Sequence, residues 1–292
     1  MVRMSKGEIE MEKGFFAPKE IIENNLNESA GKVGQPFYKI ALLGLLAGAF
    51  IAIGGQASNV AVHAMTNAGL AKTVAGTIFP VGLMLILIIG GQLFTGNCLL
   101  FMGAVDGRIT YKQMFFNWLT IFFSNFVGAL IVSFLVYHSG QFDMTGGQLG
   151  AYTIKIAAGK VHVTPVQGIT SGIMCNIIVC GAVLMAAAAK DIAGKCFAVF
   201  FPIFAFVVSG FEHCVANMYY LTAGFMASKN DAYIAKAKEV YQLTDAQIAD
   251  ISIQNIFVKN LLPVTIGNMI GGALFVGGIF YLVFGRKSKK NG

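Results

Sequence analysis

Two hydrophobic segments of this chain are interrupted near their middle by polar residues. One runs Ile86–Asn97, with Gly-Gly-Gln-Leu-Phe-Thr at the interruption, and the other runs Phe204–Asn217, with Glu212 and His213 inside an otherwise apolar stretch. A charged side chain at the centre of a bilayer costs about 2.5–3.5 kcal/mol on insertion scales. Irregular backbone at that depth must be buried in protein or line a wet cavity. Two such interruptions in the two halves of one chain indicate a solute pathway.

The composition is that of a membrane protein. Of the 292 residues 56% are hydrophobic and only 12% are charged, and the mean hydropathy is +0.68. Soluble domains carry about 25% charged residues. Apolar runs long enough to cross a bilayer lie at roughly 38–63, 73–104, 113–137, 165–189, 195–226 and 260–285. The sequence therefore predicts an all-α polytopic membrane protein with six transmembrane helices, of which the second and fifth are broken.

The distribution of Lys and Arg predicts the orientation of these helices. With six crossings, fourteen of the 21 basic residues fall on the side of the two termini and seven on the other side. Because basic residues concentrate in cytoplasmic loops, both termini are expected in the cytoplasm, with the chain in the cell membrane. The basic tail 286–292 then follows from topology, and we expect no nucleic-acid partner. The polar N-terminus predicts no cleavable signal peptide.

Three regions are expected along the chain. Residues 1–37 form a cytoplasmic segment with an amphipathic helix around Phe15–Leu26, which anchors at the membrane surface or gates a pore. Residues 38–285 form the channel domain, and 286–292 form the tail. The five cysteines show no metal or disulfide spacing, so no metal and no cofactor are expected.

The two halves of the channel domain repeat each other. Small-xxx-small pairs occur in the first span (Gly44 and Gly48) and in the fourth (Gly168 and Gly172), and a matching Asn-x-x-Gly motif occurs in 125–128 and 268–271. The two broken spans are the third matched pair. Three spans in each half invert the second half relative to the first, so the sequence predicts an inverted 3+3 repeat.

Several motifs resemble those of the formate/nitrite transporter family. They are Leu93-Phe-Thr-Gly-Asn97, Gly107-Arg-Ile-Thr110, 125–130, Lys160-Val-His162, 209–218 and 260–268, within a resemblance that runs from about 37 to 285. The resemblance implies a homopentamer of aquaporin-like protomers, each with its own pore. It also implies a set of pathway residues, namely His213, Thr95, Lys160, Asn176, Asn268 and Glu212. Apolar constrictions are implied at Leu83, Phe79, Phe206, Leu93 and Phe94.

Each pathway residue also has a simpler interpretation. His213 alone could be a satisfied buried histidine, but its place beside Glu212 at a helix break favours function, because an unperturbed histidine has a pKa of about 6.5 and can transfer protons near neutral pH. Glu212 is expected to accept hydrogen bonds from amides of the broken helix. Lys160 either snorkels at the membrane edge or attracts anions.

Two further pathway positions have the same ambiguity. Thr95 either caps the resumed half-helix or bonds a passing anion. Asn176 and Asn268 either hold helices together, at about 0.6 kcal/mol each, or link Lys160 to the pore histidine. The constriction roles rest on the resemblance alone.

The functional prediction is a channel for small monovalent anions of weak acids, with formate preferred, whose permeation depends on pH through His213. Its expected partners are the anion, protons, the lipid bilayer and further copies of the chain. Nitrite or hydrosulfide is the alternative substrate. A membrane-embedded enzyme using His213 and Glu212 is disfavoured, because the spans show no nucleophile–base pair or metal cluster.

Overall fold

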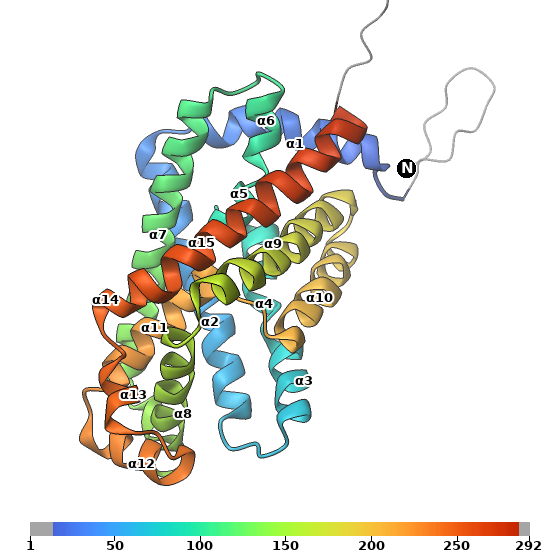
Figure 1. Cartoon of the computed structure of the whole chain (residues 1–292). Coiled ribbons are helices and arrows are strands. Elements are labelled where there is room, and N and C mark those ends of the chain that lie inside the picture. The colour runs from blue at the N-terminus through green and yellow to red at the C-terminus, as the bar shows by residue number, and fades with distance from the viewer. Residues whose placement is uncertain (1–13, 286–292) are drawn as a thin grey trace, which may run out of the picture.

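The computed structural model describes residues 14–285, which form a bundle of helices (Figure 1). The β-type pairing in this part of the chain is one isolated bridge, between Phe15 and Ala189. The basic tail 286–292 and residues 1–13 lie outside the described residues.

Six helical segments are long and apolar enough to cross a membrane, as predicted. They are Phe37–Val62, Ala68–Ile89, Tyr111–His138, Pro165–Ala188, Ile192–Ser209 and Ile253–Gly285. The sixth begins at Ile253, seven residues before the predicted start. Its first turn contains Gln254 and Asn255 and is capped by Ser252, so hydropathy alone does not detect it.

The second and fifth spans are broken, which confirms the prediction. In the second span, α3 (Ala68–Ile78) is followed by α4 (Val81–Ile89), which ends at Gly90. The helix resumes with α5 (Phe94–Asn97) and α6 (Leu100–Val105). In the fifth, α10 (Ile192–Ser209) ends at Gly210, and α11 (Cys214–Ala227) continues. Gly90 and Gly210 have φ of 109° and 72°. Glycine enters this region without the steric cost that a side chain brings.

The remaining helices complete the bundle. The intact spans are α2 (Phe37–Val62), α7 (Tyr111–His138), α9 (Pro165–Ala188) and a sixth span built from α14 (Ile253–Asn255), η2 (Ile256–Leu261), α15 (Leu262–Met269), η3 (Ile270–Gly278) and η4 (Tyr281–Gly285). Outside the spans lie α1 (Pro18–Val33), η1 (Gln141–Asp143), α8 (Met144–Val161), α12 (Asp231–Tyr241) and α13 (Asp245–Ala249).

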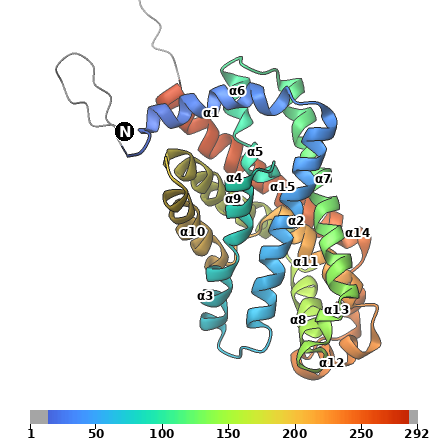
Figure 2. The same ribbon diagram turned by 180° about the vertical axis from the view of Figure 1, so that it is seen from behind.

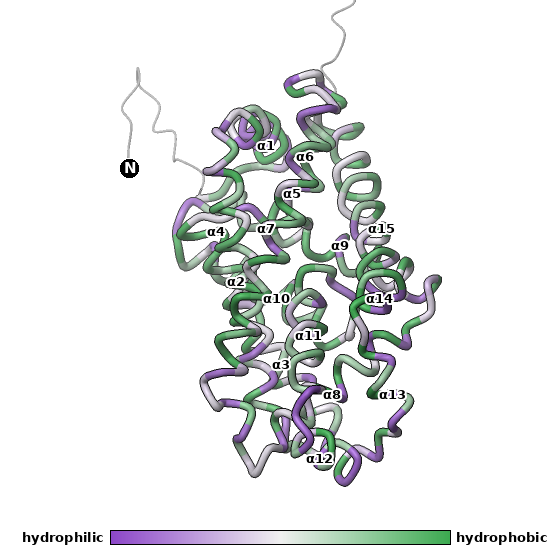
Figure 3. The backbone as a smooth tube through the Cα atoms, turned by 90° about the vertical axis from the view of Figure 1, so that its left-hand side faces the viewer, coloured by the Kyte–Doolittle hydropathy of each residue, from purple (hydrophilic) through white to green (hydrophobic). Residues whose placement is uncertain are grey.

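Both ends of the described chain lie at one end of the bundle. Figures 1 and 2 show α1 and the last turns of the sixth span together there, with α8, α12 and α13 at the opposite end. Hydrophobic residues dominate the spans, whereas hydrophilic residues are frequent in α12 and α13 (Figure 3). Six crossings with both ends on one side agree with the predicted connectivity.

Glycines allow the paired spans of each half to approach closely, and their contacts show how the halves correspond. A Cβ on Gly128 of α7 would lie 2.0 Å from the carbonyl oxygen of Leu45, and a Cβ on Gly271 would lie 2.3 Å from that of Ile173. Leu45 therefore corresponds to Ile173, and Gly44 to Gly172. The predicted pairing of the two glycine motifs is wrong by one helical turn, because small residues repeat at that interval and leave the register open.

Replacing Gly128 by alanine is expected to lower the melting temperature of the detergent-solubilised protein by several degrees. The added methyl meets backbone that cannot rotate away, and overpacking costs about 1–3 kcal/mol. Gly181→Ala in α9 is the matched control, because a Cβ there meets nothing within 4 Å. Equal melting temperatures for the two variants would contradict the close approach of α2 and α7.

Candidate permeation site

The two helix breaks meet through the side chains of Thr95 and His213. Thr95 Oγ1 lies 2.9 Å from His213 Nε2, although 118 residues separate them in the sequence. Both side chains are buried. The structure thus brings together the two polar residues that the sequence singled out in the separate breaks.

The hydrogen bonds of His213 define its neutral tautomer. Its Nδ1 accepts a hydrogen bond from the backbone N–H of Ala216 at 3.0 Å, so His213 caps α11. In the neutral ring the proton therefore sits on Nε2 and is donated to Thr95 Oγ1. The hydroxyl proton of Thr95 remains available to another acceptor. The N-cap of α5 is Leu93, without a side-chain cap, so capping does not explain Thr95.

Lys160 and Glu212 form an ion pair beside this contact. Lys160 Nζ lies 2.9 and 3.1 Å from the two carboxylate oxygens of Glu212. Asn217 and Asn260 also donate to Oε2 of Glu212, at 2.5 and 3.4 Å. The bonds that Glu212 accepts thus come from side chains, and not from amides of the broken helix as expected. Lys160 also lies over the ring of Tyr220, at 5.5 Å from its centroid.

A cavity of about 130 Å³ connects Lys160 with His213. The rings of Phe79 and Phe206 line it and pack edge to face at 5.7 Å, and Phe206 lies 5.8 Å from the His213 ring. Leu83, on α4, is buried. The predicted constriction residues Phe79 and Phe206 therefore stand together on the Lys160 side of the histidine.

Leu93 and Phe94 lie in the other break, directly before Thr95, and both are buried. The ring of Phe94 packs against Phe122 and Trp118 of α7, at 5.4 and 6.5 Å between centroids. Their role as a constriction stays a prediction.

Asn268 and Asn176 hold the backbone of the two breaks. Asn268 accepts from the N–H of Cys214 at 2.9 Å and donates to the carbonyl oxygens of Gly172 and Glu212. Asn176 donates to the carbonyl oxygens of Thr95 and Asn268, at 3.2 and 2.7 Å. None of these hydrogen bonds joins the side chain of Lys160 to that of His213, so the structure favours the helix-holding role over the expected link.

An equivalent set of residues, which the sequence analysis missed, holds the first break. Asn125 accepts from the N–H of Phe94 at 2.9 Å and donates to the carbonyl oxygens of Gly44 and Gln92. The side chain of Gln92 takes the place of Glu212. Its Oε1 accepts from Asn97 at 2.8 Å and from Asn117 at 3.0 Å, as Glu212 accepts from Asn217 and Asn260.

Lys32 corresponds to Lys160 in the other half of the repeat. The sequence Ala-Gly-Lys-Val occurs at 30–33, at the end of α1, and at 158–161, at the end of α8, so this repeat could have revealed it. Gln92 Nε2 donates to the carbonyl oxygen of Lys32 at 3.5 Å, and Asn260 Nδ2 donates to that of Lys160 at 2.9 Å. Burial lowers the pKa of Lys32, and the field of Glu28 opposes this shift.

Comparison with known proteins gives the family. The model of the formate/nitrite transporter family matches residues 19–282. The chain belongs to the formate/nitrite transporter family. It is 37% identical over 260 residues to the formate channel FocA of Haemophilus influenzae, which covers 87% of this chain and 89% of that relative. It is thus a multi-pass membrane protein of a transporter family, and the expectation that it is not an enzyme is confirmed.

Solved structures support the same fold. A structure described as a pentameric formate channel with formate bound is 34% identical, with a TM-score of 0.75 over 86% of this chain and 98% of that chain. The aquaglyceroporin from Plasmodium falciparum shares only 13% identity and has a TM-score of 0.50 over 85% of this chain and 100% of that chain. The second match concerns the fold alone, and it confirms the aquaporin-like architecture.

The surroundings of Lys32 and Lys160 differ in charge. Glu212 partly neutralises Lys160 through the ion pair at 2.9 Å. The residue in the equivalent place beside Lys32 is the neutral Gln92. The inverted repeat is therefore nearly symmetric in its hydrogen bonds but asymmetric in its electrostatics.

Asn125→Ala and Asn268→Ala are each expected to lower the melting temperature by about 3–10 °C, because each leaves buried backbone groups unpaired at about 1–3 kcal/mol. Thermal unfolding in detergent measures this. Asn27→Ala on the exposed face of α1 is the control. Asn27 accepts a hydrogen bond from Arg108 at the surface, where water replaces it. A normal melting temperature for either buried variant would show that these amides do not hold the breaks.

Proposed function

We propose that the protein is a homopentameric channel for small monovalent anions of weak acids, with formate as the preferred substrate. The contact between Thr95 and His213 at the meeting point of the two half-helices is the observation that carries the proposal. The family, the FocA relative and the formate-bound pentameric structure support the anion class, formate and the pentamer.

The orientation that we propose places both termini in the cytoplasm of a cell with the protein in its plasma membrane. The end of the bundle with α1 and the last turns of the sixth span is then cytoplasmic, and α8, α12 and α13 are external (Figure 1). The excess of basic residues on the side of the termini supports this orientation.

We also propose that residues 1–37 act as a cytoplasmic unit built around α1. Ile22 and Leu26 of this helix are almost fully buried, whereas Lys19 and Glu23 are exposed. One face of α1 therefore packs against the channel domain 38–285 and the other faces solvent, as expected of an amphipathic helix.

Lys32 and Lys160 draw the anion to the two mouths of the pathway. Each lies where a pre-span helix ends beside a helix break, and each is only partly exposed. A cation in a partly dry site attracts an anion more strongly than one in bulk water. The half-helix α11 adds its positive N-terminal end at the break that carries His213.

The step across the centre is a proton transfer to the anion. An anion cannot cross the apolar contact of Phe79 with Phe206, or an apolar constriction at Leu83, without a large desolvation cost. His213 first takes up a proton from solvent at Nδ1, which releases the N–H of Ala216. The Nε2 proton then passes to the Thr95 oxygen while the Thr95 hydroxyl proton passes to the anion, so the ring returns to its neutral form and the permeant crosses as a neutral acid. The proton returns to solvent with the acid on the far side. Permeation then rises as pH falls and excludes chloride, the anion of a strong acid.

Nitrite and hydrosulfide, which also form weak acids, remain the alternative substrates. Formate is preferred because the FocA relative and the 34% identical structure are both described as formate channels. An enzyme is not proposed, since the FocA relative and the 34% identical structure are described as channels.

Thr95→Val is expected to reduce formate flux in proteoliposomes by at least about tenfold, because valine keeps the volume but removes the hydroxyl that relays the proton. Thr95→Ser, which keeps the hydroxyl, retains most of the flux. Formate, nitrite, hydrosulfide and chloride are compared at acidic and neutral pH. Equal flux through both variants would contradict the relay, and no flux of any anion through the wild type would contradict the channel.

Lys32→Gln is expected to raise the half-saturating formate concentration on the cytoplasmic side by about threefold or more, with less effect from the external side. Gln92→Glu should act in the same direction, because it places a carboxylate beside Lys32 as Glu212 stands beside Lys160. Lys19→Gln on the exposed face of α1 is the control. Unchanged half-saturation in both variants would remove Lys32 from the pathway.

A further inference from the structure

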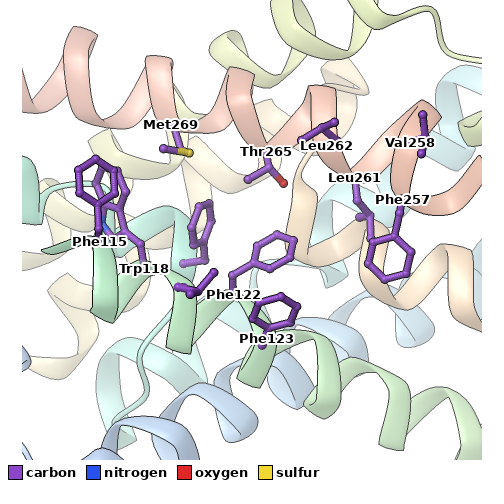
Figure 4. Close-up of a pocket in the computed structure, with 12 residues that line it drawn as sticks. Phe115, Trp118, Phe122, Phe123, Phe257, Val258, Leu261, Leu262, Thr265 and Met269 are labelled. Atoms are coloured by element: carbon purple, nitrogen blue, oxygen red, sulfur yellow. The ribbon is translucent and has the colours of Figure 1, made fainter. Parts of the chain in front are cut away.

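A second cavity opens sideways between α7 and the sixth span, away from the permeation site. Its volume is about 450 Å³. Figure 4 shows aromatic side chains of α7 on one wall and mainly aliphatic side chains of the sixth span on the other. Among the described residues that line it there is no charged side chain, and Thr265 supplies the polar group.

The cavity leads from the outer surface of two spans to the first helix break. Leu119, Val258 and Leu262 at its rim are each close to 60% exposed, whereas Trp118 and Phe94 are 5% and 3% exposed. Phe94 directly precedes Thr95, so the inner end of the cavity lies behind the loop that carries the pore hydroxyl. Both walls belong to segments long and apolar enough to span a membrane, so the cavity opens at the depth of the bilayer hydrocarbon.

The size and shape of the cavity restrict its occupant. An α-helix with its side chains is about 10–12 Å across, which favours a thinner occupant in a gap between two spans that contact each other. The walls and the inner end come from one protomer, and the rings of Phe126 and Phe257 join the two spans beside the opening at 5.4 Å. If the cavity were empty, the side chains that line it would lose dispersion contacts on one side. A flexible, unbranched hydrocarbon chain can enter the cavity and provide these contacts.

We propose that this cavity binds one acyl chain of a membrane lipid, which packs against Phe94 and Trp118 and supports the loop that carries Thr95. Apart from the Thr265 hydroxyl and the Trp118 indole N–H, which donates to the carbonyl oxygen of Asn97, the lining is apolar and uncharged, so recognition is by shape and dispersion. The proposal does not depend on the transported solute.

Trp118 is the only tryptophan of the chain and lies in the cavity, so its fluorescence reports the occupant directly. The full-length protein is reconstituted in phosphatidylcholine that is brominated near the middle of its acyl chains, and in the same lipid without bromine. Bromine quenches tryptophan only at close range. We expect strong quenching of the wild type and loss of most of it in Thr265→Phe, which fills the cavity.

We expect Thr265→Phe to fold. Asn268 of the sixth span corresponds to Asn125 of α7, so Thr265 corresponds to Phe122, and the repeat already carries a phenylalanine at this position. Normal elution on size exclusion and normal formate flux check this, and Val258→Phe at the rim is the second filling variant. Leu274→Phe is the matched control, since it is 53% exposed on the same span outside the cavity and should be quenched like the wild type.

Two results would overturn the proposal. Absence of quenching in the wild type would mean that a side chain of a neighbouring subunit fills the cavity. Equal quenching of the wild type and of both filling variants would mean that the bromine reaches Trp118 from the bulk bilayer. Either result leaves the transport measurements unaffected, so the two proposals fail separately.

Discussion

The structure depends on satisfying unpaired backbone groups at two helix breaks inside a membrane. A broken helix leaves N–H and C=O groups without partners, and no water competes for them in hydrocarbon. Asn125 and Asn268 solve this in the same way, each accepting from the first N–H of a resumed helix and donating to two carbonyl oxygens. The glycines that bring α7 and the sixth span against their partners make this reach possible.

The proposed function depends on positions where the two halves differ. By the same correspondence, Leu93 occupies the place of His213, and Val215 that of Thr95, so the hydroxyl and the imidazole come from non-equivalent positions. Thr95 Oγ1 and His213 Nε2 meet at 2.9 Å, and the apolar residues at the corresponding positions cannot form a second such contact. Asn176 stands where the first half has Gly48. The side-chain amide of Asn176 donates to the carbonyl oxygen of Thr95 at 3.2 Å. A symmetric scaffold thus carries an asymmetric site.

Much of this could be predicted from the sequence, because lipid imposes long apolar runs and makes each polar exception visible. The six spans, the two breaks, the inverted repeat and the prominence of Thr95 and His213 follow from that contrast. The sequence analysis did not identify Gln92 and Asn125 as the residues that hydrogen-bond the backbone and side chains of the first break. An amide side chain in an apolar run does not reveal which groups it bonds. The correspondence of Lys32 with Lys160 was missed because Lys32 lies in a polar segment, where a lysine is common and does not stand out. The glycine register was wrong because one-turn repeats of small residues align equally well at two offsets.

The most direct test of the account is the coupling of formate to protons under a controlled membrane potential. Proteoliposomes containing a pH-sensitive dye receive a formate gradient, with the potential set by potassium and valinomycin and protein-free liposomes as the reference for formic acid leakage. If the anion is protonated at Thr95 and His213, each formate enters with one proton and the rate does not respond to the potential. A rate that follows the potential, without acidification of the interior, would show passage of the bare anion and contradict the account.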